Sequence, residues 1–279
     1  MCLPACSEVV EQNLKNRREF LQALGGGIAA MGLGCARPLA KSVESPLPLN
    51  RAVTMAVDLT HTLTPTFPTY GGKEQFSLEP LATYEKNGYS GKRWTLAEHT
   101  GTHIDAPIHF SKGGLSVGEI PAKALVVSLV VVDIRAKASV NADSELTVDD
   151  LKQWEAKHGP IPPGACVAMN TGWAEKAGGP GFRNADEKGT LHFPGFHEDA
   201  VDFLLEERNI NGIAVDTLSL DIGKSTTFSV HSRLLPANRW GLECVANLSA
   251  VPAAGATLIV GAPKVAEGTG GLTRLFALV

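Results

Sequence analysis

The most constraining feature of this sequence is a group of three histidines and one aspartate within eleven residues. The segment reads HTGTHIDAPIH, and its three histidines and its aspartate all occupy odd-numbered positions: His99, His103, Asp105 and His109. On an extended chain these side chains would share one face. The apolar residues of the segment would then face the core on the other side: Ile104, Ala106, Ile108 and Phe110.

A straight strand does not bring the first two histidines together. His99 and His103 would lie about 13 Å apart, at roughly 3.3 Å per residue, whereas the ligands of one ion must converge. The chain must therefore bend, and Gly101 is the residue between them that best allows it. The competing geometry is a helical turn that pairs the histidines at positions i and i+4, which Gly101 and Pro107 disfavour.

Imidazole and carboxylate groups together are ligands that suit Zn or Mn. Two or three such ligands leave open positions for water, and a divalent ion lowers the pKa of a bound water toward neutrality. The segment therefore indicates a metal site with water as the nucleophile. The alternative is a set of histidines with unrelated structural roles, which their density in this segment disfavours.

Size and composition permit an enzyme and argue against a nucleic-acid partner. A chain of 279 residues can bury a sizeable core without disulfides. The sequence is 44% hydrophobic and 19% charged, with a formal net charge of −4. Neither disorder nor the basic surface of a nucleic-acid-binding protein is indicated.

The first forty residues differ from the rest and resemble a twin-arginine export signal. Arg17-Arg18-Glu19-Phe20-Leu21 precedes a weakly apolar run rich in Gly and Ala over residues 23–34. We expect residues 1–40 to be a signal peptide read by the twin-arginine export machinery and 41–52 to be a linker. The protein is then expected outside the cytoplasm, in the periplasm, with lipidation at Cys35 as a minor alternative.

The cysteines leave one question open in the predicted domain, residues 53–279. Three of the five lie in the leader, and Cys166 and Cys244 remain. These two either form a single disulfide, which an oxidising compartment permits, or stay as buried free thiols.

The hydrophobic pattern of residues 53–279 predicts an α/β domain with a mixed sheet. The expected strands are short β-branched runs: 126–134, 165–170, 213–216, 257–260 and 275–279. Helices are expected over 147–158 and 198–208, with Thr147 as the N-cap of the first and Asp150 near its free amides. The glycine-rich stretch 268–271 lacks the ending of a phosphate loop and is interpreted as a tight turn.

The full pattern H-x-G-T-H-x-D-x-P-x-H resembles the signature of the cyclase family, which includes bacterial kynurenine formamidases and isatin hydrolases. Further segments are similar to that family across residues 53–279: Asp58-Leu59-Thr60, Phe193-Pro194-Gly195, 215–221 and 255–261. The resemblance implies one compact α/β domain with a mixed, barrel-like β core flanked by helices. It also implies a dimer or a larger homo-oligomer.

The resemblance implies a site for one or two divalent ions, Zn or Mn. One ion would be held by the first three motif residues: His99, His103 and Asp105. The second would be held by Asp105 together with two later residues, His231 and Glu243. His109 would carry a proton near the attacking water, or else only support a ligand carboxylate through a hydrogen bond.

The implied activity is hydrolysis of the C–N bond of a small aryl or cyclic amide by metal-activated water. Cleavage of an N-formyl arylamine, as in kynurenine formamidases, is the best single expectation, and opening of a cyclic amide such as isatin would use the same groups. The alternatives are a cyclase or lyase acting on a polyketide-like substrate and a non-catalytic periplasmic metal- or ligand-binding protein. Trp173 and Phe67 either line an aromatic pocket or belong to the core.

Overall fold

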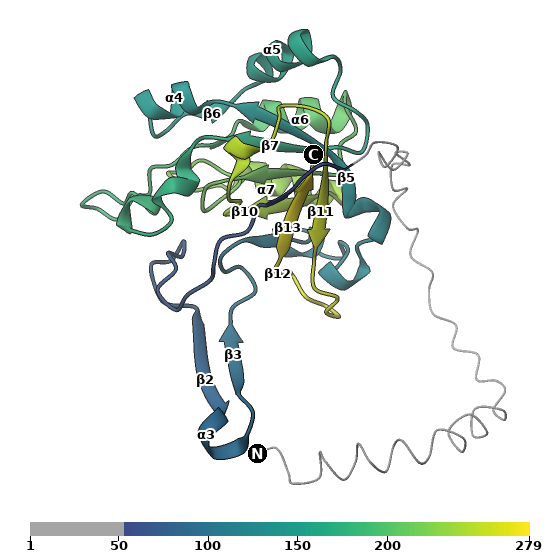
Figure 1. Ribbon diagram of the computed structural model, residues 1–279. Coiled ribbons are helices and arrows are strands. Elements are labelled where there is room, and N and C mark those ends of the chain that lie inside the picture. The colour runs from purple at the N-terminus through teal and green to yellow at the C-terminus, as the bar shows by residue number, and fades with distance from the viewer. Residues whose placement is uncertain (1–52) are drawn as a thin grey trace, which may run out of the picture. The chain divides into compact units, whose positions relative to one another are not determined.

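Nine strands form one mixed sheet that curls into a half barrel in the computed structural model, which describes residues 53–279 (Figure 1). The strands follow the order β1 (Ala56–Asp58), β13 (Arg274–Leu278), β11 (Ala256–Gly261), β5 (Val126–Asp133), β7 (Cys166–Asn170), β9 (Gly212–Val215), β10 (Trp240–Glu243), β4 (His103–Asp105) and β12 (Gly270–Leu272). The α/β fold with a mixed, barrel-like sheet is therefore as predicted. The export signal and linker predicted within residues 1–52 lie outside the described residues.

The centre of the sheet is parallel and buried because helices cover it. Strands β5, β7, β9 and β10 run parallel to one another, and parallel strands need crossover connections that place helices on the sheet. Helices α5 (Val148–His158) and α6 (Glu198–Glu206) lie together beside these strands (Figure 1). Trp154 of α5 is buried there, and its Nε1 donates a hydrogen bond to the Val131 carbonyl at 3.1 Å.

The predicted strands and helices are confirmed, apart from small shifts at their ends. Thr147 caps α5 in a capping box with Asp150, which accepts a hydrogen bond from the Thr147 backbone N–H at 2.7 Å. Helix α6 ends at Glu206, two residues earlier than expected. The remaining short elements are α4 (Arg135–Val140), α7 (Ser229–Leu234), the parallel pair β6 (Glu145–Leu146) and β8 (Gly195–Phe196), and the 3₁₀ turns Pro107–His109, Val117–Glu119, Ala122–Ala124, Trp173–Lys176, Pro180–Phe182, Leu235–Ala237 and Leu248–Ala250.

The interpretation of residues 268–271 as a tight turn is wrong. Gly270 and Gly271 belong to β12, which pairs with β4 at the end of the sheet. A Cβ atom on Gly270 would lie 2.4 Å from the Ile104 carbonyl oxygen, and one on Gly271 would lie 2.4 Å from the Pro263 ring. These glycines therefore serve close packing of a strand and not the conformation of a turn.

The two cysteines and the two uncertain aromatic residues belong to the protein interior. Cys166 and Cys244 are buried free thiols, so the disulfide alternative is wrong. Trp173 and Phe67 pack in a hydrophobic cluster with Phe182, so they have a core role. Within residues 53–279, no helix has the length and apolarity needed to cross a membrane.

A hairpin that the sequence analysis did not predict projects from the domain (Figure 1). It consists of β2 (Phe76–Ala82), the short helix α3 (Tyr84–Asn87) and β3 (Gly91–Leu96), and β2 and β3 form a separate two-stranded sheet. Leu78 and Trp94 are opposed across its strands, and both are exposed. A groove of about 560 Å³ lies at its base, lined in part by the same two side chains.

We expect this hairpin to pack against a second copy of the chain, because an isolated two-stranded hairpin is marginally stable and exposed apolar faces mark interfaces. Trp94→Asp should therefore lower the molar mass in solution from that of a dimer or larger assembly to that of a monomer. Size-exclusion chromatography with light scattering measures this. Val140→Asp is the matched control, since Val140 is 88% exposed on α4, and a monomeric parent protein would contradict the expectation.

Candidate metal centre

Strands β4 and β10 bring three of the predicted ligands together from distant parts of the chain. The antiparallel register pairs Glu243 on β10 with His103 on β4, and directly opposed side chains share one face of a sheet. Asp105, two residues further along β4, points to the same face. The residues opposite Asp105 are glycines on both neighbouring strands, Gly241 and Gly270. Space beside the aspartate is therefore left for further ligands.

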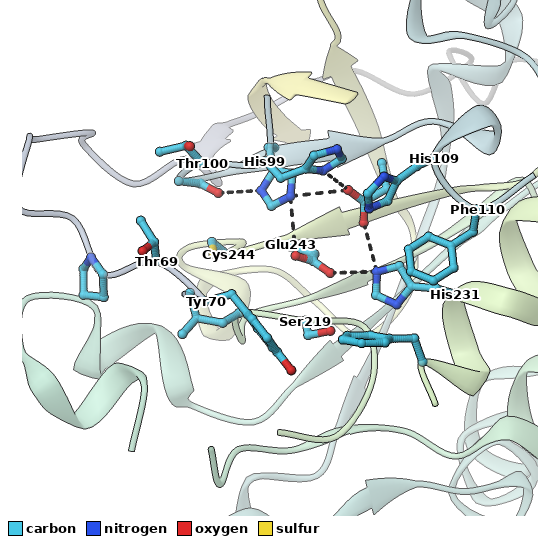
Figure 2. Close-up of a pocket in the computed structure, with 16 residues that line it drawn as sticks. Thr69, Tyr70, His99, Thr100, His109, Phe110, Ser219, His231, Glu243 and Cys244 are labelled. Carbon is cyan, nitrogen blue, oxygen red and sulfur yellow. Dashed lines mark hydrogen bonds and ion pairs between the residues drawn. The ribbon is translucent and has the colours of Figure 1, made fainter. Parts of the chain in front are cut away.

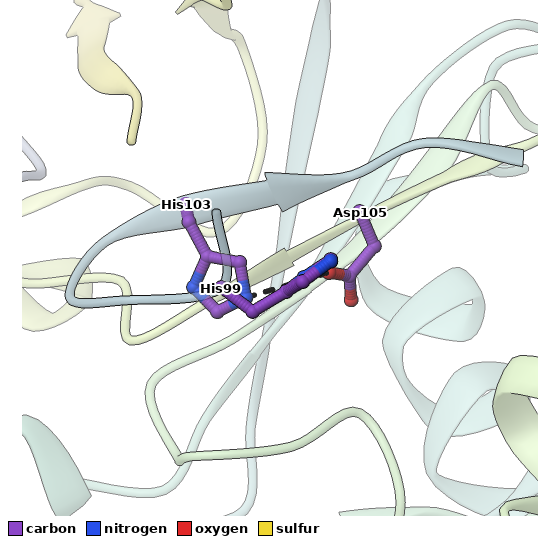
Figure 3. Close-up of side chains that lie close together, drawn as sticks. All are labelled: His99, His103 and Asp105. Carbon is purple, nitrogen blue, oxygen red and sulfur yellow. Dashed lines mark hydrogen bonds and ion pairs between the residues drawn. The ribbon is translucent and has the colours of Figure 1, made fainter. Parts of the chain in front are cut away.

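Gly101 makes the bend that brings His99 to the same place. Its φ of +64° lies in the left-handed region that glycine adopts without strain. After this turn, His99 Nδ1 lies 2.7 Å from Asp105 Oδ1, and the His99 and His103 ring centroids are 5.2 Å apart (Figure 3). The predicted bend at Gly101 is confirmed, and the helical alternative is wrong because His103 begins a strand.

His231 reaches the site from the short helix α7 and is oriented by Asp221. The Asp221 carboxylate accepts hydrogen bonds from the backbone N–H groups of Val230 at 2.9 Å and His231 at 3.2 Å, and lies 2.5 Å from His231 Nδ1. His231 Nε2 is thereby turned toward Asp105 Oδ2, at 3.4 Å, and Glu243 Oε1, at 3.3 Å (Figure 2).

All five predicted ligands lie in two groups that share one aspartate. Within each group the potential ligand atoms lie within 4.8 Å of one another: His99, His103 and Asp105 in the first, Asp105, His231 and Glu243 in the second. All are buried except His99, which is half-buried. This is the arrangement that the family resemblance implied.

The geometry of His103 fits a cation between these side chains. Its Nδ1 lies 2.8 Å from the Gly101 carbonyl and must donate to it, so the neutral ring carries a lone pair on Nε2. That nitrogen lies 3.4 Å from both Asp105 Oδ1 and Glu243 Oε2. Within residues 53–279, His103 Nε2 and Asp105 Oδ2 are buried without a hydrogen-bond partner. Lone pairs that face each other in a buried space require a positive charge between them.

The pKa shifts of His103, His231 and Asp105 also favour positive charge among these side chains. Burial alone would lower the pKa of His103, but Asp105 and Glu243 outweigh it and raise the pKa to about 9. Burial opposes the charged form of His231 as well, yet the neighbouring carboxylates of Asp105, Asp221 and Glu243 raise its pKa well above the ordinary value. Burial would raise the pKa of Asp105, and the neighbouring imidazoles of His103, His231 and His99 instead hold it well below its ordinary value.

His109 stands beside this cluster and is not one of its members. It ends the 3₁₀ turn Pro107–His109, and its ring stacks on that of His99 with centroids 4.0 Å apart. Burial lowers its pKa to about 4, against the attraction of Asp105 and with the help of the neighbouring histidines. This imidazole is therefore neutral at pH 7 because it is desolvated.

The cluster opens into a cavity of about 290 Å³ with an aromatic wall (Figure 2). Phe110 and Phe228 lie 5.9 Å apart between centroids, and Tyr70 lies 6.1 Å from Phe228. The Phe110 ring is 4.8 Å from that of His231. An apolar cavity with a few convergent polar groups is typical of a small-molecule site.

One predicted side-chain direction is wrong, and two contacts at the site were not predicted from the sequence. Ile104 and Ala106 are buried in the core as expected, but Phe110 lines the cavity because the 3₁₀ turn before it interrupts the strand alternation. Asp221 and Thr269, which touch His231 and His99, were not assigned roles. No spacing in the sequence relates them to those histidines, since both contacts arise from tertiary packing.

Comparison with known proteins decides the family. The family model described as "Putative cyclase" matches residues 57–222. The chain belongs to the cyclase family. An isatin hydrolase from Roseibium aggregatum is 36% identical over 213 residues, which cover 72% of this cyclase-family chain and 80% of that protein.

Solved structures of cyclase-family relatives have the same fold. Isatin hydrolase A from Labrenzia aggregata, bound to benzyl benzoate, is 39% identical with a TM-score of 0.76, and the match covers 81% of this chain and 93% of that one. Isatin hydrolase A from Ralstonia solanacearum is 38% identical with a TM-score of 0.76, over 81% of this chain and 92% of that one.

Because Asp105 belongs to both ligand groups, Asp105→Asn should remove all bound divalent metal. Metal analysis after dialysis measures this. The parent protein should also lose stability when treated with a chelator, by about 2.7 kcal/mol where the metal is present at 100 times its Kd, whereas Asp105→Asn should show no such change in thermal unfolding. Asp143→Asn removes a carboxylate that pairs with a histidine elsewhere, His192, and should behave as the parent. A full metal content in Asp105→Asn would contradict the shared ligand.

Proposed function

We propose that the protein is a metal-dependent hydrolase that cleaves the C–N bond of a small aryl or cyclic amide. The observation that carries this proposal is the pair of ligand groups sharing Asp105 at the base of an aromatic cavity. Isatin hydrolases among the relatives support it and favour a cyclic aryl amide over an N-formyl arylamine. Both substrates present a planar ring and a carbonyl bonded to nitrogen.

In the proposed reaction, the metal site would activate water and polarise the carbonyl, and His109 would transfer the proton. A divalent ion held by these five residues would lower the pKa of a bound water and polarise the amide carbonyl. The neutral His109 imidazole is able to accept a proton from the attacking water. With a pKa lowered to about 4, its imidazolium is a stronger acid than free histidine, which favours delivery of that proton to the departing nitrogen.

The aromatic wall supports a planar substrate. A substrate ring held over the ligand cluster can stack on, or pack edge-to-face against, three aromatic side chains: Phe110, Phe228 and Tyr70. Phe228 has φ +49° and ψ +48°, a left-handed conformation that costs a bulky side chain roughly 1–3 kcal/mol. Strain of this kind concentrates at binding sites, so we assign the Phe228 ring to substrate binding.

A panel of substrates with and without a chelator tests the proposed function. We expect hydrolysis of isatin and of N-formyl arylamines, with slower hydrolysis of aliphatic amides that lack a ring, and loss of all activity with chelator. The assay follows product release by absorbance. Turnover of polyketide-like substrates without amide hydrolysis would indicate a cyclase or lyase. Metal binding without turnover of any compound would indicate a binding protein.

His109→Ala should keep the bound metal and lose turnover, because the variant removes the proton carrier and no predicted ligand. The expected loss in kcat is roughly 10²- to 10⁴-fold, the usual contribution of general acid–base catalysis. Steady-state kinetics and metal analysis on the same preparation measure both effects. His158→Ala is the matched control, since His158 packs on Trp154 at the end of α5. Parent-like rates in His109→Ala would exclude the proton-carrier role.

A further inference from the structure

The segment 268–271 lies directly against His99, the half-buried member of the ligand cluster. Thr269 Oγ1 lies 3.0 Å from His99 Nε2, and the Thr269 carbonyl accepts a hydrogen bond from the Ala106 N–H at 2.9 Å. A Cβ atom on Gly270 would lie 2.7 Å from His99 Cε1. The glycine thus makes room for the imidazole, and the threonine next to it contacts the nitrogen that faces away from the cluster.

A second contact sets the direction of the Thr269–His99 hydrogen bond. The Thr269 hydroxyl donates its only proton to Glu98 Oε2, and the Glu98 carboxylate also accepts the Thr269 backbone N–H at 3.2 Å. A hydroxyl that has given its proton to a carboxylate is left with acceptor lone pairs. Thr269 Oγ1 therefore accepts from His99 Nε2–H.

This direction determines which nitrogen of His99 faces the cluster without a proton. With one proton held on Nε2, a cation that replaces the proton of the 2.7 Å hydrogen bond between Nδ1 and Asp105 Oδ1 meets a lone pair on Nδ1. His103 and His231 are arranged the other way, with Nδ1 bonded to an outer acceptor and Nε2 facing the carboxylates. Each of the three imidazoles has one outer partner that turns the other nitrogen inward.

We propose that Thr269, held by Glu98, is a positioning residue that fixes the proton of His99 on Nε2 and keeps Nδ1 available to a divalent cation. The inference rests on the metal site of the proposed function. It extends that site by two residues that do not line the substrate cavity. Outer hydrogen bonds of this kind orient a histidine and raise its basicity as a ligand.

Thr269→Val tests the role of the hydroxyl with little change in shape. We expect Zn affinity, measured by competition with a chelating dye, to fall roughly 10- to 100-fold, the usual cost of losing such an outer partner. Thr269→Ser restores the hydroxyl and should bind within about twofold of the parent. Glu98→Gln should fall between these two, because an amide is a weaker acceptor than a carboxylate. Glu267→Gln removes the charge of a nearby exposed glutamate and should not change affinity.

A second measurement separates positioning from misfolding and from the proposed function. Nitrogen-15 NMR of the Zn-loaded protein reports which nitrogen of His99 carries the proton, and we expect Nε2 in the parent and Thr269→Ser proteins. Parent-like Zn affinity together with an unchanged tautomer in Thr269→Val would overturn the proposal. Weaker Zn binding by a folded Thr269→Val, in a protein that hydrolyses no amide, would leave the positioning role intact and reject the hydrolase.

Discussion

The structure depends on two buried carboxylates that face three imidazole nitrogens across a small space. Asp105 and Glu243 are both buried, and His103 and His231 each turn a nitrogen toward them. Unpaired charges in such surroundings are costly, so the arrangement is stable only with protons or a metal cation among the groups. Because the ligands come from the first half of the domain and from residues more than 120 positions later, a bound divalent cation also links the two halves.

The end of the sheet formed by β10, β4 and β12 leaves space for this cluster. Strand β4 has only three residues, and glycines on both neighbouring strands lie opposite Asp105. Three backbone or side-chain acceptors outside the cluster hold the imidazoles: the Gly101 carbonyl, the Asp221 carboxylate and the Thr269 hydroxyl. The inward direction of the ligands is therefore set by the surrounding hydrogen bonds.

The sequence predicted what is local and missed what depends on distant packing. The bend at Gly101, the cap at Thr147 and the central strands follow from neighbouring residues, so pattern and conformational preference were sufficient. His231 and Glu243 were assigned only through the family resemblance, because the pairing register of β10 with β4 places Glu243 and the tertiary packing of α7 places His231. The glycines at 268–271 were misinterpreted for the same reason. A glycine required for close approach to another strand has no local signal that separates it from a turn.

The backbone conformation of Phe228 and the hydrogen bonds of Asp221 together position the cavity wall and the ligand His231. Phe228 adopts a left-handed backbone that glycine or asparagine would occupy more easily, and it lies immediately before the helix that carries His231. The Asp221 carboxylate accepts the first amides of that helix and also orients its histidine. One loop carboxylate and one strained backbone position thus set the helix, the ligand and the aromatic wall together. Because Phe228 both lines the cavity and precedes α7, a change that relaxes its backbone is expected to alter the cavity and the direction of His231 together.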